Sequence, residues 1–204
     1  MHDKQAQKLA DDLQESALPG VCDVGMQSGE VSLFCTPDSL VECARILRDR
    51  SSYRFRMLVD IAGVDYPARS PRFQLVYHLL SLNHNRRVMV KVDVDASDPV
   101  PTVTELWPNA LWYEREAWDM YGIFFAGNPD LRRILTDYGF EGHPQRKDFP
   151  LTGYVELRYD ESQKRIVQAP VQLPQAFRDF DFTSPWEGQP WEGKPLPGDE
   201  KASK

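Results

Sequence analysis

YEREAWDMYGIFFAGNPDLRRIL, residues 113–135, threads charges of both signs among large aromatic side chains. Its charged residues are Glu114, Arg115, Glu116, Asp119, Asp130, Arg132 and Arg133. Charges surrounded by aromatic side chains persist in a folded protein only where they are paired and hydrogen-bonded. We therefore expect this stretch to form a scaffold of paired ions or an interface, around which the rest of the chain is organised.

The first half of the stretch predicts a helix over residues 111–121. Gly122 follows it and suits the left-handed position that ends many helices. Arg115 and Asp119 are four residues apart, within ion-pair reach on one helical surface. Residues 130–135 predict one or two further helical turns.

The residues before this stretch alternate between helical and strand patterns. Helical patterns cover residues 4–17 and 37–50, and strand patterns cover residues 21–26, 31–35, 55–61, 72–82 and 87–94. Every second residue from 88 to 94 is valine, which is typical of a strand with one buried face. Strands clustered between helices predict an α+β fold, a two-layer domain with a mixed β-sheet and helices on one side.

The character of the sequence changes after residue 135. We expect an α+β domain over residues 1–135 and an extended C-terminal segment over residues 136–204, with a hairpin at about 154–168. The arm over residues 170–204 is rich in proline but contains Trp186 and Trp191. Solvated tails are usually poor in aromatic residues, so the arm is predicted to wrap a partner.

Net charge and cysteine spacing argue against several kinds of site. The chain has 24 Lys and Arg against 31 Asp and Glu, a formal net charge of −7. Non-specific nucleic-acid binding needs clustered cations, so no nucleic-acid partner is expected. Cys22, Cys35 and Cys43 lack the spacing of zinc or iron–sulfur ligands, and their odd number makes a poor disulfide framework. We expect all three to be reduced and buried.

Neither a membrane span nor a targeting segment is expected. The sequence has no apolar run of the roughly eighteen residues that a spanning helix requires. Its first thirty residues are polar and acidic and lack an apolar core, unlike a secretory signal or an organellar transit peptide. Any attachment to a membrane would therefore be indirect, through a partner.

A catalytic interpretation of the charged stretch can be weighed against a structural one. Glu114, Glu116 and Asp119 could form an acid/base set with His143, because paired carboxylates can divide general acid and base roles. Neutralisation by Arg115, Arg132 and Arg133 is favoured, because no nucleophile signature accompanies the carboxylates. His143 precedes Pro144 and has no second ligand at metal-binding spacing. The sequence also lacks the glycine-rich loops that bind nucleotides, so it predicts a binding or structural module.

A more specific likeness begins with Glu114, Arg115 and Glu116 and continues through Asp119, Gly122 and NPDLRRIL at residues 128–135. It runs on through DYGFEGHPQRKDFPLTGYVELRYDESQKRIV at residues 137–167 and FRDFDFTSPWEG at residues 177–188, with LVDIAGVDYP at residues 58–67 upstream. Over residues 31–188 the chain resembles the 30 kDa subunit family, known as the C subunit, of the proton-pumping NADH:quinone oxidoreductase, respiratory complex I.

The resemblance assigns structural or interfacial roles to a set of signature positions, with no catalytic, cofactor or metal residue among them. These positions are Glu114, Arg115, Glu116, Asp119, Gly122, Pro129, Asp130, Arg132, Arg133, His143 and Trp186. One position departs from the family, which usually has histidine where this chain has Asn128. Because asparagine does not titrate near neutral pH, a proton role at this position is not expected in this chain.

The resemblance also implies a role and partners. It implies a non-catalytic peripheral-arm subunit that scaffolds the quinone-reducing module, while FMN, iron–sulfur clusters and quinone belong to partner subunits. The assembled complex passes electrons from NADH through these groups to quinone and couples the transfer to proton translocation. This chain would pack chiefly on the D subunit of the complex, with the B and I subunits nearby. Lack of a transit peptide points to the cytoplasmic side of a bacterial inner membrane, with peripheral attachment.

Two alternatives stay open on the sequence. A homologous subunit serves membrane-bound hydrogenases, and only the identity of the partners would distinguish that role. A stand-alone hydrolase built on the carboxylates of residues 114–119 belongs to a different class, and it predicts turnover by the purified chain that is lost in Glu116→Gln.

Overall fold

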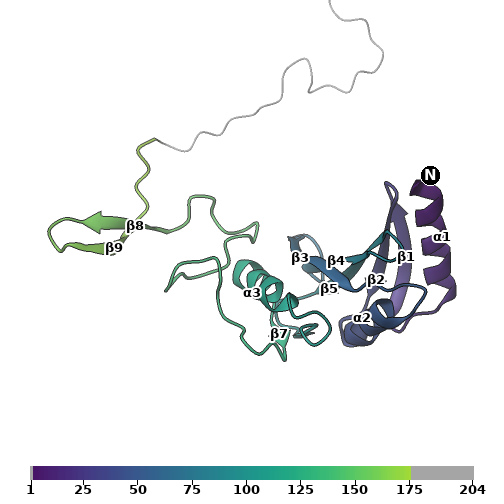
Figure 1. The fold of residues 1–204 in the computed structure, drawn as a ribbon. Coiled ribbons are helices and arrows are strands. Elements are labelled where there is room, and N and C mark those ends of the chain that lie inside the picture. The colour runs from purple at the N-terminus through teal and green to yellow at the C-terminus, as the bar shows by residue number, and fades with distance from the viewer. Residues whose placement is uncertain (1, 176–204) are drawn as a thin grey trace, which may run out of the picture. The chain divides into compact units, whose positions relative to one another are not determined.

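The computed structural model describes residues 2–175, with side chains from residue 5 onward (Figure 1). The chain divides into two compact units, Met1–Tyr154 and Val155–Lys204. The boundary expected at residue 135 lies inside the first unit, because the residues after it are tied back to that unit. The N–H of Thr136 donates to Asp119, and the N–H of Lys147 donates to Asp65.

The first unit is an α+β domain. In chain order it contains α1 (His2–Glu15), β1 (Val21–Gln27), β2 (Glu30–Cys35), a 3-10 turn (Pro37–Ser39), α2 (Leu40–Asp49), β3 (Met57–Asp65), β4 (Phe73–Ser81), β5 (Arg86–Val94), β6 (Val100–Pro101), α3 (Ala110–Tyr121) and β7 (Phe125–Ala126). The predicted helices and sheet strands before residue 122 are therefore present. Most of their bounds agree within two or three residues, and β3 runs further, to Asp65, than the predicted end at residue 61.

Five strands form one mixed sheet in the order β1-β2-β5-β4-β3. Neighbouring strands are antiparallel except β2 and β5, which run parallel with Ser32 opposite Met89 and Phe34 opposite Lys91. The mixed sheet predicted from the sequence is confirmed. The parallel pair joins the N-terminal hairpin β1–β2 to the meander β3–β4–β5.

Alternate residues of the central strands point into a core beneath the helices. Leu75 and Tyr77 of β4 and Val90 of β5 are each no more than 2% exposed. They belong to one hydrophobic cluster with the buried leucines of α1 and α2. This alternation is what the valine pattern of residues 88–94 predicts, and it confirms a two-layer arrangement with helices on one side.

Helix α3 crosses the sheet close to β3. A Cβ atom added at Gly63 of β3 would lie 2.5 Å from ring carbons of Tyr121, a distance at which carbon atoms clash. Glycine at this position lets the C-terminal turn of α3 rest directly on the strand backbone. This contact fixes where the charged residues of α3 stand relative to the sheet.

The helical turn predicted over residues 130–135 is absent, and these residues form a turn at Asp130, irregular backbone and then bends. The reason lies in their hydrogen bonds. The Arg115 side chain donates hydrogen bonds to the carbonyls of Arg132 and Arg133. The Asp119 carboxylate accepts hydrogen bonds from the backbone N–H groups of residues 134–136. Backbone groups engaged by side chains in this way are not free for a helical ladder.

Two short features also depart from the sequence predictions. Val100–Pro101 and Phe125–Ala126 form a two-residue parallel pair, β6–β7, too short to leave a periodic pattern. Cys35 and Cys43 are buried free thiols as expected, but Cys22 is exposed. Cys22 lies on β1, which is an edge strand of the sheet, so the expectation that all three cysteines are buried is wrong.

In the second unit, the structure describes the hairpin of β8 (Val155–Asp160) and β9 (Arg165–Pro170). The strands pair antiparallel from Val155 opposite Pro170 to Asp160 opposite Arg165. The hairpin predicted at about residues 154–168 is thereby confirmed. Most of the arm expected over residues 170–204, including Trp186 and Trp191, lies outside the described residues.

Candidate functional site

Helix α3 contains the first part of the charged stretch, and three of its charged side chains are buried. Glu114 and Asp119 are 0% exposed and Arg115 is 6% exposed. Carboxylates at such burial remain ionised only if hydrogen-bond donors replace water around them. The partners of these three side chains therefore determine what the site can do.

Asp119 receives five hydrogen bonds from a single following segment. Its Oδ1 accepts from Arg133 Nη1 at 2.8 Å and from Thr136 Oγ1 at 2.8 Å. Its Oδ2 accepts from the backbone N–H groups of Ile134, Leu135 and Thr136 at 3.1, 2.9 and 3.0 Å. One buried carboxylate thus fixes the course of residues 133–136 across α3.

These donors set the ionisation of Asp119. Burial pulls its pKa upward, but the hydrogen bonds from Thr136, Leu135 and Ile134 outweigh burial and lower the pKa of Asp119 to about 2. The carboxylate therefore stays ionised at any physiological pH. A group with so low a pKa is a poor general base near neutrality.

Glu114 is held differently, by neutral donors alone. Its Oε1 accepts from the N–H of Val103 at 2.8 Å, and its Oε2 accepts from Thr102 Oγ1 at 2.6 Å and from Asn128 Nδ2 at 2.7 Å. Within the described part of the chain, no cation reaches it at ion-pair distance. Burial raises the pKa of Glu114, and the three donors offset only part of that effect.

The contacts of Glu114 connect two loops. Thr102 and Val103 follow β6, and Asn128 follows β7, so one carboxylate holds together the two segments that leave the same end of the short parallel pair. Asn128 serves this clamp as a donor through Nδ2, while its Oδ1 accepts from the N–H of Asp130. An amide side chain performs both tasks without titration.

Arg115 binds backbone carbonyls instead of the carboxylate one helical turn away. Its Nε donates to the carbonyl of Arg132 and its Nη2 to the carbonyl of Arg133, each at 3.0 Å. Its Nη1 lies 3.7 Å from Asp130 Oδ2. Arg115 and Asp119, which helical spacing places within ion-pair reach, take other partners, because the chain reverses after α3 and supplies both residues with partners from residues 130–136.

The C-terminal end of α3 is capped by a third part of the same segment. Gly122 adopts φ +78°, and its N–H donates to the carbonyl of Trp118. The ring Nδ1 of His143 lies 2.9 Å from the carbonyl oxygen of Asp119, and Arg146 Nε donates to the carbonyl of Tyr121 at 2.7 Å. Helix carbonyls that would lack partners are thus satisfied by side chains, and a cation lies at the negative end of the helix dipole.

His143 acts as a structural cap at this position. Burial lowers the pKa of His143, and the nearby positive charges of Arg146 and Arg133 lower it further. The histidine is therefore neutral at physiological pH, which suits a ring that donates through Nδ1 to a carbonyl. Among the residues that the structure describes, no group of three metal-ligating side chains exists.

A second buried carboxylate anchors the segment to the sheet. Asp65, at the end of β3, is 2% exposed and pairs with Arg72 through Nε–Oδ1 at 2.7 Å and Nη2–Oδ2 at 2.8 Å. It also accepts from the N–H of Lys147, while Arg72 reaches Asp148 at 2.8 Å. No sequence pattern signals this network, because its members lie in a loop, a strand end and a distant turn.

The remaining signature residues lie at the surface. Glu116, Pro129 and Arg132 are exposed, and Asp130 is half-buried. Arg132 Nε pairs with Asp130 Oδ1 at 2.8 Å. In residues 5–175 Glu116 makes no ion pair, so the expected neutralisation of all three carboxylates by arginines applies to Asp119 and not to Glu114 or Glu116. Trp186 lies outside the described residues.

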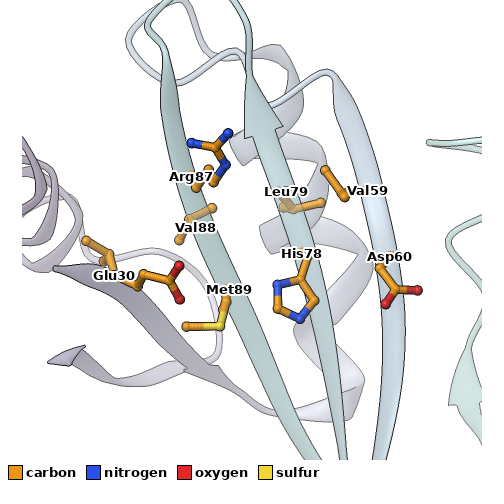
Figure 2. Close-up of a pocket in the computed structure, with 9 residues that line it drawn as sticks. Glu30, Val59, Asp60, His78, Leu79, Arg87, Val88 and Met89 are labelled. Carbon is orange, nitrogen blue, oxygen red and sulfur yellow. The ribbon is translucent and has the colours of Figure 1, made fainter. Parts of the chain in front are cut away.

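A hollow on the opposite face of the sheet is also lined by titratable groups. Figure 2 shows Glu30, Asp60, His78 and Arg87 standing on four different strands around it. Asp60 Oδ1 accepts from the backbone N–H of Ile61, and no hydrogen bond joins it to His78 within the described chain. Asp60 and His78 are therefore not a hydrogen-bonded pair in this structure.

The site and the fold together define a class of protein. Glu114, Arg115 and Asp119 fasten loops and strands of their own chain, and Arg132 and Glu116 are left at the surface. Among the residues described, no helix is both long and apolar enough to cross a membrane. The fold and these contacts define an α+β domain organised around a charged node, which comprises Glu114, Arg115, Asp119, Arg133 and His143.

The family is shown by sequence comparison. The family described as "Respiratory-chain NADH dehydrogenase, 30 Kd subunit" matches residues 33–155, and the chain belongs to this family. Over 176 residues it is 61% identical to the C subunit of the NADH-quinone oxidoreductase of Novosphingobium aromaticivorans, covering 86% of this chain and 55% of that protein. It is 57% identical over 190 residues to the protein of the same name from Rhodospirillum rubrum, covering 92% and 89%. The chain therefore spans about half the length of the first relative and most of the second.

A solved structure is similar to the described fold. It is a chain from the membrane-bound sulfane sulfur reductase, an archaeal respiratory membrane complex. The likeness has a TM-score of 0.62 at 26% sequence identity and covers 80% of this chain and 99% of that chain. The family identified from the charged stretch and its flanks is confirmed by the family match and by the two relatives.

Proposed function

We propose that this chain is a non-catalytic peripheral-arm subunit of an NADH:quinone oxidoreductase complex and scaffolds the module that reduces quinone. The observation that carries the proposal is the use of the signature charges for internal bonds. Asp119 accepts five hydrogen bonds and Glu114 accepts three, all from the chain itself. The names of the relatives support membership of such a complex.

The electron carriers of the complex would then belong to partner subunits. Within residues 5–175 the buried carboxylates of Glu114 and Asp119 accept their hydrogen bonds from donors of the chain itself. A scaffold of this kind orders the chain and presents a fixed surface to its neighbours. FMN, iron–sulfur clusters and quinone are accordingly proposed to be bound by other subunits.

The proposed partners are the proteins that adjoin the 30 kDa family in the complex, chiefly the D subunit, with the B and I subunits nearby. The surface offered to them includes Arg132, which is 67% exposed on its side chain and shares Asp130 with the buried Arg115. A rim charge of this kind contributes to orientation and rate of association. Attachment to the cytoplasmic side of a bacterial inner membrane would be indirect, through these partners.

The experiment that tests this function is a tagged pull-down of the chain from mildly solubilised membranes. The expected result is recovery of partner subunits together with flavin, iron–sulfur clusters and NADH:quinone reductase activity. Recovery of the chain without partners, or turnover of a hydrolytic substrate by the chain alone, would contradict the proposal.

A second candidate is a homologous subunit of a related respiratory complex, such as a membrane-bound hydrogenase. The likeness to a chain of the archaeal sulfane sulfur reductase complex favours keeping it, because the same fold occurs in a different respiratory assembly. The pull-down distinguishes the two. Hydrogenase subunits without a flavin-containing NADH dehydrogenase would support the second candidate.

A variant sharpens the test of the partner surface. Arg132→Ala is expected to leave the first unit folded, because the side chain is exposed, and to lower the yield of assembled complex, because an interfacial charge is lost. Arg45→Ala on α2 is the matched control, since Arg45 is also exposed and lies outside the node. Equal yields from the two variants would show that Arg132 does not contact a partner.

A further inference from the structure

The C-terminal hairpin separates apolar and charged side chains between its two faces. Val155, Leu157 and Tyr159 alternate along β8, and Ile166 of β9 stands directly opposite Tyr159. These four side chains share one face with Gln168 and Pro170, and they are 51%, 52%, 60% and 67% exposed. Amphipathic alternation of this kind is what a strand pair shows when one face is to be buried.

The other face of the hairpin is already satisfied. Glu156 and Arg158 form an ion pair with each other. At the turn, Asp160 accepts from the N–H groups of Ser162 and Gln163 and from both of their side chains. This face and the turn are therefore compatible with water, and the apolar face is left without a counterpart within residues 155–175.

A hairpin of two strands does not stabilise itself in water. An isolated pair is marginal at best, and three strands or packing against another layer are normally required. Figure 1 shows that β8 and β9 form a sheet of their own, and among the described residues neither has a third strand beside it. Something must cover the apolar face for the hairpin to persist in this form.

We propose that the apolar face of Val155, Leu157, Tyr159 and Ile166 docks on an apolar surface of a neighbouring subunit in the same respiratory complex. The proposal rests on the proposed function, because it requires the chain to be part of an assembly. Its centre carries no charged side chain, so the partner surface is expected to be uncharged at its centre, as the cores of protein interfaces are.

The area of the face argues for a neighbouring subunit over a second copy of this chain. The four side chains expose on the order of 400 Å², a patch size that marks interaction sites, but about half of the ~800 Å² that each partner buries in a standard interface. Two hairpins alone would not hold a dimer. A neighbour that also contacts the first unit needs only this additional area, because the first unit supplies the rest.

The test places the same charge on opposite faces of the hairpin in the full chain. Leu157→Asp puts a carboxylate at the centre of the apolar face. Val167→Asp puts one on the charged face, directly opposite Arg158, where an acidic residue is favourable. The expected result is at least a tenfold lower recovery of neighbouring subunits with Leu157→Asp and unchanged recovery with Val167→Asp.

The outcomes separate this proposal from the proposed function. If the wild-type chain recovers no subunits, the proposed function fails. If it recovers them and Leu157→Asp does so equally, or if both variants lose them equally, the docking face is refuted. Hydrogen exchange of residues 155–170 adds an independent reading. Rapid exchange in the free chain and slow exchange in the complex support the docking face, and slow exchange already in the free chain would show that the chain covers its own hairpin.

Discussion

Replacing Asp119 by asparagine is the sharpest test of the charged node. Asparagine has nearly the same shape as aspartate, so the packing of α3 is retained while the acceptor chemistry changes. One of the two oxygens becomes an NH₂ group that faces N–H donors of residues 134–136 or the guanidinium of Arg133. Two donors then point at each other, and Arg133 loses its charged partner.

The expected loss of stability follows from the ionisation and the hydrogen bonds. A pKa of Asp119 lowered from 3.8 to about 2 corresponds to about 2 kcal/mol of stabilisation near neutral pH. The donors that lower this pKa are the same ones that the amide would disturb, so the ~1–3 kcal/mol for a buried donor left without an acceptor describes the same loss and is not added to it. Asp119→Asn should therefore lower the free energy of unfolding by about 2–3 kcal/mol, a large share of the stability of a domain.

Urea unfolding of the purified full chain at pH 7, followed by tryptophan fluorescence, measures this change. Glu116→Gln on the same helix is the control, because Glu116 is exposed, and it should change the free energy by less than ~0.5 kcal/mol. The pH dependence supplies a second check. Because the pKa of Asp119 is lowered on folding, its contribution is complete above pH 3.8 and is lost as the pH falls toward 2. A loss below ~1 kcal/mol in Asp119→Asn would refute a node built on this carboxylate.

Other substitutions probe the remaining contacts. Glu114→Gln should lower the free energy of unfolding by about 1–2 kcal/mol, less than Asp119→Asn does, because burial raises the pKa of Glu114 and the folded state tolerates a neutral group there. An equal loss of stability for the two variants in urea unfolding would contradict this. Gly122→Ala should lower the free energy of unfolding by about 2 kcal/mol, because φ is +78° and a Cβ would lie 2.5 Å from Arg146 Nη2. Gly25→Ala on β1 serves as the control, because its Cβ would lie 3.7 Å from a ring carbon of Phe34, an ordinary contact. Arg72→Met should lower the free energy of unfolding by about 3 kcal/mol, because it leaves Asp65 unpaired, and it should lower the thermal midpoint accordingly. Asp148→Asn, at the exposed end of the same network, should leave the thermal midpoint unchanged. Equal shifts of the thermal midpoint in the two variants would show that Asp65 does not depend on Arg72.

The sheet and helices were predictable because their patterns are local. Alternating valines at residues 88–94 define the buried face of β5 by themselves. The sequence also singled out Glu114, Arg115 and Asp119 as charges in need of partners. That inference depends only on the cost of placing charge among aromatic side chains.

The hydrogen-bond partners of these charged side chains could not be predicted from local sequence patterns. Helical spacing suggests that Arg115 meets Asp119, but the chain reverses between β7 and Arg132 and brings competing groups to both. Thr102 gave no signal, and Asn128 was noted only as a departure from the histidine of the family, because a short polar residue in a loop looks the same whether or not it faces a buried carboxylate. The helical turn predicted at residues 130–135 failed for the same reason, since its backbone groups are used by side chains of α3.

The parallel contact between β2 and β5 has a consequence for how the chain reaches its folded state. The β1–β2 hairpin and the β3–β4–β5 meander each consist of contacts close in sequence and can form early, but Ser32 meets Met89 only when the two pieces come together. Pairings between residues so far apart in sequence slow folding, because a long loop must lose conformational entropy on closing before the stabilising contacts form. Until that step, β2 and β5 each present an open edge in what becomes the middle of the sheet. A newly synthesised chain is therefore most prone to aggregate during this interval.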